Sequence, residues 1–112
     1  MMEIRAEFSP FNGKLWFGSH VQSHYYAFYE DPDNQLNNVE VTINYDDKRN
    51  EMSTSVALNM VECSLEFTEY KKLPKVRDYM AAARKAVRRF NKKFSETVGA
   101  VIVPRFHKEE EE

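Results

Sequence analysis

The chain has 112 residues, 42% of them hydrophobic and 30% charged, with a formal net charge of −2. This length suits one domain with its own core, and the apolar content excludes a solvated, disordered coil. No run approaches the 18 apolar residues of a membrane-spanning helix, and the first residues do not resemble a secretory signal. The single cysteine, Cys63, excludes an internal disulfide and fits a reducing compartment. We therefore expect a cytoplasmic protein with no membrane segment.

Charge is strongly segregated along the chain. Residues 1–70 hold four Lys or Arg against twelve Asp or Glu, whereas residues 71–94 hold ten Lys or Arg against one acid. The chain ends in four consecutive Glu residues, 109–112. An acidic body, a basic segment and an acidic tail together favour a polyanionic partner. The competing interpretation is that the basic segment faces acidic parts of its own fold or of a second subunit.

Alternating apolar residues predict three strands near the N-terminus. Residues 4–8 alternate apolar and polar side chains, and the Asn-Gly pair at 12–13 predicts a hairpin turn before a second strand at 14–17. Residues 21–29 form a third strand that is rich in aromatic side chains. An acidic loop at residues 30–34 follows it.

Two further strands differ in the phase of their apolar side chains. Residues 39–45 alternate most cleanly, and a turn is expected at 46–50. Residues 56–60 share one phase and 61–67 the opposite phase, which requires a β-bulge or a sharp bend between them. Cys63 lies on the apolar side of the second stretch, where a free cysteine is usually a small buried hydrophobe.

A change of period after this stretch predicts one long helix. Pro74 suits the first turn of the helix, which should end before Gly99. Its apolar residues follow a 4-3-4-3-4 spacing and form one stripe: Val76, Met80, Ala83, Val87, Phe90 and Phe94. We expect this stripe, including Phe90, to pack on the sheet. A coiled-coil seam between subunits is the alternative.

The last extended segment, residues 100–104, is expected at a sheet edge because Pro104 cannot donate to a central ladder. The element order predicts the α+β class: an antiparallel β-sheet of about five or six strands with one long C-terminal helix packed on it. Residues 1–106 should form a single α+β domain, and residues 107–112 a disordered acidic tail.

The basic segment is the clearest functional signal. Like charges stacked four residues apart on a helix repel each other, and cations near its N-terminus oppose the helix dipole. Bound phosphate would relieve both strains. Alternatively, Glu62, Glu66, Glu69 or the tail neutralises these cations. The candidate nucleic-acid-binding cations are Lys71, Lys72, Lys75, Arg77, Arg84, Lys85, Arg88, Arg89, Lys92 and Lys93.

An aromatic cluster supplies the second part of the predicted site. Trp16, Tyr25 and Tyr26 are the candidates for stacking on nucleic-acid bases. Because neighbouring strand residues point to opposite faces, one face of this strand meets the core and the other is exposed or contacts a subunit. Burial of both faces is the competing interpretation. The aromatic strand and the edge segment predict a homo-oligomer.

We predict a non-enzymatic domain that binds nucleic acid, single-stranded or structured, or another phosphate-rich ligand. No cofactor is expected, because three glycines leave no glycine-rich phosphate loop. The alternative is a small protein-binding inhibitor or adaptor, such as a virus or mobile element encodes. Its acidic part would then imitate nucleic acid for a protein partner.

Two weaker patterns point to metal chemistry. Asp33 with Glu69 and Lys71 matches a metal-dependent nuclease pattern, in which two carboxylates hold Mg²⁺ and a lysine lies beside the attacking water. His20 and His24, four residues apart on one strand face, would need Asp31 or Asp33 to complete a zinc site. The nuclease matches are common by chance, and the two histidines have no Cys or third His nearby in the sequence, so neither a metal site nor an enzyme is predicted.

Overall fold

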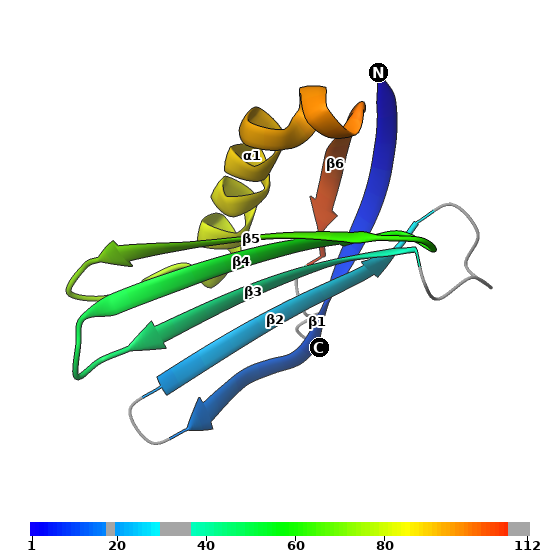
Figure 1. Cartoon of the computed structure of the whole chain (residues 1–112). Helices are drawn as coiled ribbons and strands as arrows, with labels where there is room; N and C mark the ends of the chain where they lie inside the picture. Colours follow the sequence, from blue (N-terminus) through cyan, green and yellow to red (C-terminus); the bar gives the residue numbers. More distant parts are fainter. Residues whose placement is uncertain (18–19, 30–36, 108–112) are drawn as a thin grey trace.

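We describe the protein from a computed structural model over residues 1–17, 20–29 and 37–107, with the backbone alone at residues 9–17. Within these residues the predicted α+β class is confirmed, with one helix packed on a six-stranded sheet (Figure 1). The strand order is β5-β4-β3-β2-β1-β6. The elements are β1 (Met2–Phe17), β2 (His20–Phe28), β3 (Asn38–Asp46), β4 (Glu51–Asn59), β5 (Ser64–Lys72), α1 (Tyr79–Val98) and β6 (Ala100–Phe106).

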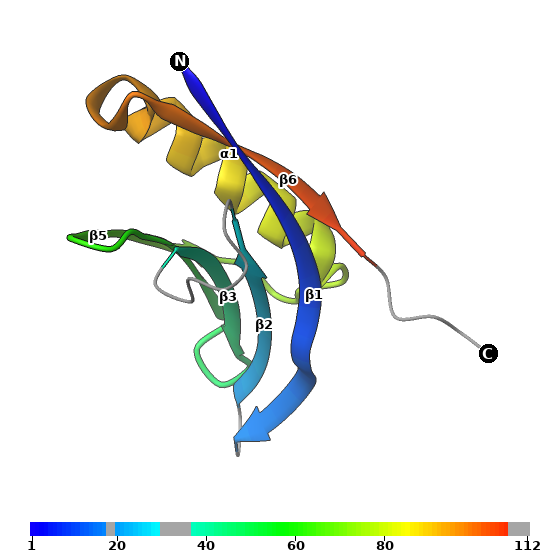
Figure 2. The same ribbon diagram turned by 90° about the vertical axis from the view of Figure 1, so that its right-hand side faces the viewer.

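Strand β1 joins two parts of the sheet. Its first half pairs in parallel with β6, with Met2 opposite Ala100 and Phe8 opposite Phe106, and its second half pairs antiparallel with β2. The predicted edge position of residues 100–104 is confirmed, but the parallel pairing of that edge was not predicted. Figure 2 shows α1 between β5 and the β1–β6 pair, so the sheet curves around one face of the helix.

The hairpin predicted at residues 12–13 is wrong. Strand β1 continues through the Asn-Gly pair, and the β1–β2 register shifts between Pro10 and Lys14. An irregularity of this kind accommodates residues that are poor in a regular ladder without ending the strand. The predicted acidic loop at 30–34 lies outside the described residues.

The change of phase after residue 60 marks a turn between two antiparallel strands. Asn59 lies opposite Ser64, and the Met60 amide donates a 2.8 Å hydrogen bond to the Cys63 carbonyl. The predicted sharp bend is therefore present, although residues 61–63 belong to the turn and not to the strand. As a consequence Cys63 is exposed, and the prediction that it is buried is wrong.

Helix α1 begins later than predicted and ends where expected. The Asp78 carboxylate accepts a 2.9 Å hydrogen bond from the Ala81 amide and caps the N-terminus. The Tyr45 hydroxyl lies 2.6 Å from the Pro74 carbonyl, which a helix starting at Pro74 would need for its own first turn. Gly99 ends the helix with φ +73°, a left-handed conformation that glycine adopts without strain.

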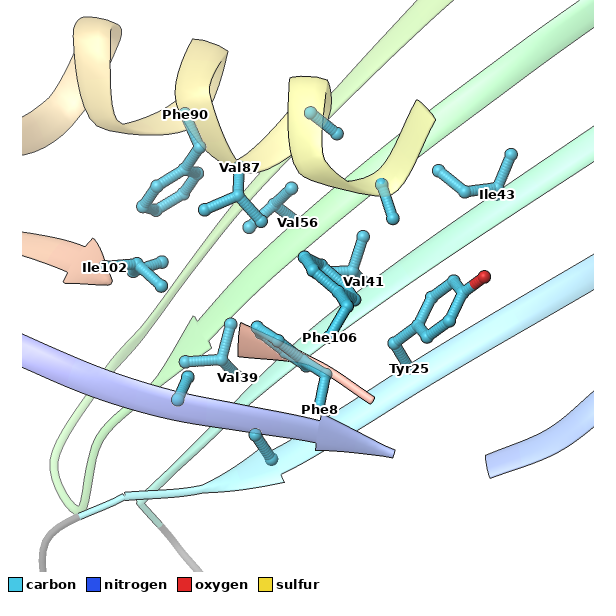
Figure 3. Packing of buried hydrophobic residues seen from close by; sticks show 14 of the residues in the cluster. Phe8, Tyr25, Val39, Val41, Ile43, Val56, Val87, Phe90, Ile102 and Phe106 are labelled. Atoms are coloured by element: carbon cyan, nitrogen blue, oxygen red, sulfur yellow. The ribbon is translucent and has the colours of Figure 1, made fainter. Parts of the chain in front are cut away.

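The apolar stripe of α1 packs on the concave side of the sheet. Phe90 is 2% exposed, and Figure 3 shows it and Val87 pointing from the helix toward Val56 and Ile102. The prediction for Phe90 is confirmed, and the stripe is a helix–sheet interface and not an intersubunit seam. The stripe residue Val76 precedes the helix and packs against the core from the connection.

One polar side chain also fastens α1 to the sheet. Asn91 donates a 2.8 Å hydrogen bond from Nδ2 to the Ile102 carbonyl and accepts a 2.8 Å bond at Oδ1 from the Ile102 amide. Two such bonds imitate one step of a β-ladder along the outer side of β6. No helix in the described part of the chain is long and apolar enough to span a lipid bilayer.

Candidate nucleic-acid interface

The ten predicted cations occupy three successive elements, and all ten are exposed. Two lie on β5, two on the connection to the helix, and six on α1. The helix carries a single acid, Glu96, within its bounds. In the same order along the chain the cations are Lys71 and Lys72; Lys75 and Arg77; Arg84, Lys85, Arg88, Arg89, Lys92 and Lys93.

Arg89 is neutralised within the fold. Its Nε and a terminal nitrogen donate hydrogen bonds of 2.6 Å and 2.5 Å to the two carboxylate oxygens of Glu69 on β5. The hydrogen bond from Arg89 holds the pKa of Glu69 below its ordinary value, and the positive charges of Arg89 and Lys93 act in the same direction against partial burial. The self-compensation considered from the sequence therefore occurs at this position. Glu62 and Glu66 form no ion pair with the described helix cations.

Three further cations of the predicted site contact aromatic rings or a carboxylate of the protein itself. The Lys93 ammonium lies 4.8 Å from the centre of the Phe67 ring, and the Arg84 guanidinium lies 5.8 Å from that of Phe106. Cation–π contacts of this kind position the side chain but leave its charge uncompensated. Lys72 pairs at 3.5 Å with Glu51 on the adjacent strand.

Four cations of α1 lie in a row along its solvent side, and their charges are not compensated by a described carboxylate. We call Arg84, Lys85, Arg88 and Lys92 the cationic ridge. No described carboxylate forms an ion pair with any of them. Because a helix rises 1.5 Å per residue, the ridge extends for about 12 Å from its first member to its last. The ridge is therefore a compact, solvent-exposed patch of positive charge.

The predicted aromatic residues do not gather in one place. Tyr25 is 4% exposed and packs edge-on against Phe106 at 5.2 Å, so it belongs to the core and cannot stack on a base. Tyr26 is half-buried on the opposite face of β2, where its ring meets that of Phe28 at 4.9 Å. The sequence prediction that Tyr25 and Tyr26 face opposite ways is confirmed. The Trp16 side chain lies outside the described residues.

The face of the sheet that carries Tyr26 is acidic. Burial and the charge of Glu40 both raise the pKa of the Tyr26 hydroxyl. Lys72 is the one Lys or Arg on this face of β2–β5. The carboxylates there are Glu40, Asp46, Glu51 and Glu66. Figure 2 shows that α1 covers one face of the sheet. The register and burial of β2 place Tyr26 on the other face, so the cationic ridge of α1 and Tyr26 lie on opposite sides of the sheet.

Neither of the two metal-binding patterns in the sequence corresponds to a metal site in the described residues. The His20 Nε2 lies 3.3 Å from an oxygen of Asp46, and the His24 Nε2 lies 3.7 Å from an oxygen of Glu40. No group of three potential ligands occurs in the described ranges, and Asp31 and Asp33 lie outside them. Glu69 and Lys71 do share a strand face as expected, but Arg89 occupies both oxygens of the Glu69 carboxylate.

Comparison of the chain with models of known protein families, with curated protein sequences and with solved structures gives no match.

Proposed function

We propose that this protein binds nucleic acid through its phosphate backbone, using the cationic ridge of α1. The observation that carries the proposal is the set of four neighbouring helix cations that have no described carboxylate partner. Arg84, Arg88 and Lys92 stack four residues apart, an arrangement that destabilises an isolated helix by a few tenths of a kcal/mol per pair. Phosphates on the ridge would turn this repulsion into attraction.

The placement of the aromatic side chains supports phosphate contact without base stacking. Tyr25 is enclosed in the core, and Tyr26 lies on the acidic face opposite the ridge. Contacts to phosphates carry no direct sequence information. We therefore expect similar affinity for different base sequences, and binding to both single-stranded and structured nucleic acid.

A salt series tests this mode of binding. The ridge carries four cations, so it can neutralise about four phosphates. The logarithm of the affinity should then fall against the logarithm of the salt concentration with a slope of about −3 for a single strand. Fluorescence anisotropy with labelled DNA and RNA measures this slope. Affinity independent of salt, or no binding at about 50 mM salt, contradicts the proposal.

Tyr26→Ala separates phosphate contact from base stacking. This substitution removes a ring on the acidic face and leaves the ridge intact, so the affinity for single strands should not change. Stacking contributes about 1–3 kcal/mol per base. A loss of affinity of about fivefold or more in Tyr26→Ala would therefore show that the bases contact the sheet.

A protein partner is the second candidate, as an inhibitor or adaptor would require. The observation that favours it is the edge of β5, which pairs with no second described strand and borders a cleft lined in part by Lys71 and Lys85. The expected homo-oligomer also stays a prediction.

A further inference from the structure

The two edge strands of the sheet differ in how their outer backbone groups are satisfied. On β5, Leu73 donates to Asn50 at 2.9 Å and Met60 donates to Cys63 at 2.8 Å, which fixes the odd-numbered residues of β5 as those bonded to β4. The amides and carbonyls of the alternate residues therefore point outward: Ser64, Glu66, Thr68, Tyr70 and Lys72. In the described part of the chain these outward groups have no backbone partner (Figure 1).

The edge at β6 is closed instead. There the even-numbered residues point outward, because the His107 amide donates to the Phe8 carbonyl at 3.0 Å. Asn91 of the helix occupies both groups of Ile102, and Pro104 has no amide hydrogen to offer. Proteins commonly protect an edge in these two ways against pairing with another chain. Strand β5 has neither protection: it contains no proline, and no described side chain bonds to its outward backbone groups.

A cleft of about 290 Å³ lies beside β5, between the sheet and α1. Its apolar lining includes Met52, Ala82 and Ala86. Lys71 from β5 and Lys85 from α1 add positive charge to its walls, and neither has an ion-pair partner in the described ranges. Together the edge and the cleft offer backbone pairing and a place for side chains that have an apolar stem and an anionic end.

We propose that the edge of β5 binds an extended acidic segment of a partner protein as an additional strand, with its carboxylates over the cleft. Strand addition draws affinity from backbone hydrogen bonds and selectivity from pockets that receive alternate side chains. The carboxylates fall on the helix side because Lys71 and Lys85 lie there, whereas the other side of β5 carries the balanced charges of Glu66 and Lys72.

The same charges argue against a second copy of this chain as the occupant. Antiparallel pairing of β5 with its own copy would bring two sets of clustered cations together along one groove. On the described surface, each set comprises Lys71, Lys85, Arg89 and Lys93, against the single carboxylate of Glu69. An acidic strand replaces that repulsion with attraction.

The probe for the test is a labelled eight-residue peptide in which Glu alternates with Val, compared with the same peptide carrying Lys in place of Glu. Anisotropy should show saturable binding of the acidic peptide and none of the basic one. Two further peptides carry N-methyl groups on the Val amides or on the Glu amides. Only one of the two should lose binding, because alternate amides of an added strand face β5. Equal binding of both methylated peptides overturns strand addition, and so does a peptide that fails to bind at millimolar concentration.

Matched variants of the protein locate the peptide. Thr68→Pro removes an outward amide and should abolish binding, whereas Thr68→Val keeps that amide and should not change it. Lys71→Glu should weaken binding about fivefold, while Lys72→Glu, whose side chain lies on the other face, should leave it unchanged. Equal affinities within either pair refute the proposed site, and circular dichroism checks that each variant is folded. In light scattering, Thr68→Pro should leave the oligomeric state of the wild type unchanged. Loss of an oligomer in this variant would show that β5 pairs with a second copy and would overturn the acidic partner.

The test is separate from that of nucleic-acid binding. Arg88→Glu with Lys92→Glu removes half of the cationic ridge at positions that do not line the cleft. This double variant should bind the peptide normally whether or not it has lost affinity for nucleic acid. Loss of peptide binding in the double variant would mean that the peptide is held by the ridge and not by β5.

Discussion

Asn91 offers a direct measurement of how strongly α1 is fastened to the edge of the sheet. Asn91→Ala removes two hydrogen bonds of 2.8 Å to Ile102. Two such bonds together contribute about 1–3 kcal/mol to the free energy of unfolding. Alanine has a higher helix propensity than asparagine by roughly 0.5 kcal/mol, so the free energy of unfolding should fall by about 0.5–2.5 kcal/mol. For a domain of this size the entropy of unfolding is about 0.24 kcal/mol/K, which converts the loss into a fall in Tm of about 2–10 °C.

Thermal unfolding followed by circular dichroism measures this shift, and Lys92→Ala is the control. Lys92 is the neighbouring residue and is exposed, so its variant should melt within about 1 °C of the wild type. Native-state hydrogen exchange adds a residue-level measurement, because only Asn91→Ala should accelerate exchange of the Ile102 amide. If Asn91→Ala melts at or above the wild-type temperature with unchanged exchange at Ile102, the two bonds do not hold the helix and the reasoning is refuted.

Three other predictions concern the core, an ion pair and assembly. Phe90→Ala should lose about 3–5 kcal/mol, or roughly 13–21 °C in Tm, with no new dependence on protein concentration; an unchanged Tm would place Phe90 at the surface. Because the pKa of Glu69 is lowered from 4.5, the stability difference between wild type and Glu69→Gln should be complete at pH 7 and shrink as the pH falls below about 4.5. Urea unfolding at several pH values measures it, and a difference that grows in acid would contradict the hydrogen bond to Arg89. Light scattering should return a mass of at least twice 13.2 kDa at micromolar concentration, whereas the monomer mass would exclude the expected homo-oligomer.

The parts of the fold that were predictable are those in which one local pattern decides the structure. Residues 39–45 alternate cleanly and form the central strand β3, whose odd-numbered side chains are buried. The stripe through Ala83, Val87 and Phe90 likewise fixes which face of α1 meets the sheet. In both cases the burial of apolar surface and the period of the backbone agree, so no distant residue is needed to decide the outcome.

The errors occur where a distant residue overrides a local signal. The start of the helix depends on Tyr45, which lies about thirty residues earlier in the chain and occupies the Pro74 carbonyl. The Asn-Gly pair at 12–13 lies within a register shift of β1 and does not form a turn, because β1 pairs with β2 on both sides of it. No short-range pattern reports that β6 pairs in parallel with a strand at the other end of the chain.

In the candidate site, too, the sequence predicted what depends on local residues and missed what depends on distant ones. The sequence located the run of cations, since charge is read directly from residue identity. It did not show which cations are neutralised: the Arg89–Glu69 pair joins residues twenty apart, on a helix and an edge strand. Nor did it show that Tyr26 and the cations lie on opposite faces, because that separation depends on which side of the sheet the helix covers.

The most direct test of nucleic-acid binding by the cationic ridge compares two triple charge reversals in one anisotropy experiment at about 50 mM salt. Arg84→Glu, Arg88→Glu and Lys92→Glu reverse the ridge, whereas Arg5→Glu, Lys48→Glu and Arg105→Glu make the same change in net charge at exposed positions elsewhere. The ridge variant should lose binding to labelled DNA and RNA, and the control should retain most of it. Equal losses in the two variants would show that binding follows net charge alone, and would contradict a binding surface on α1.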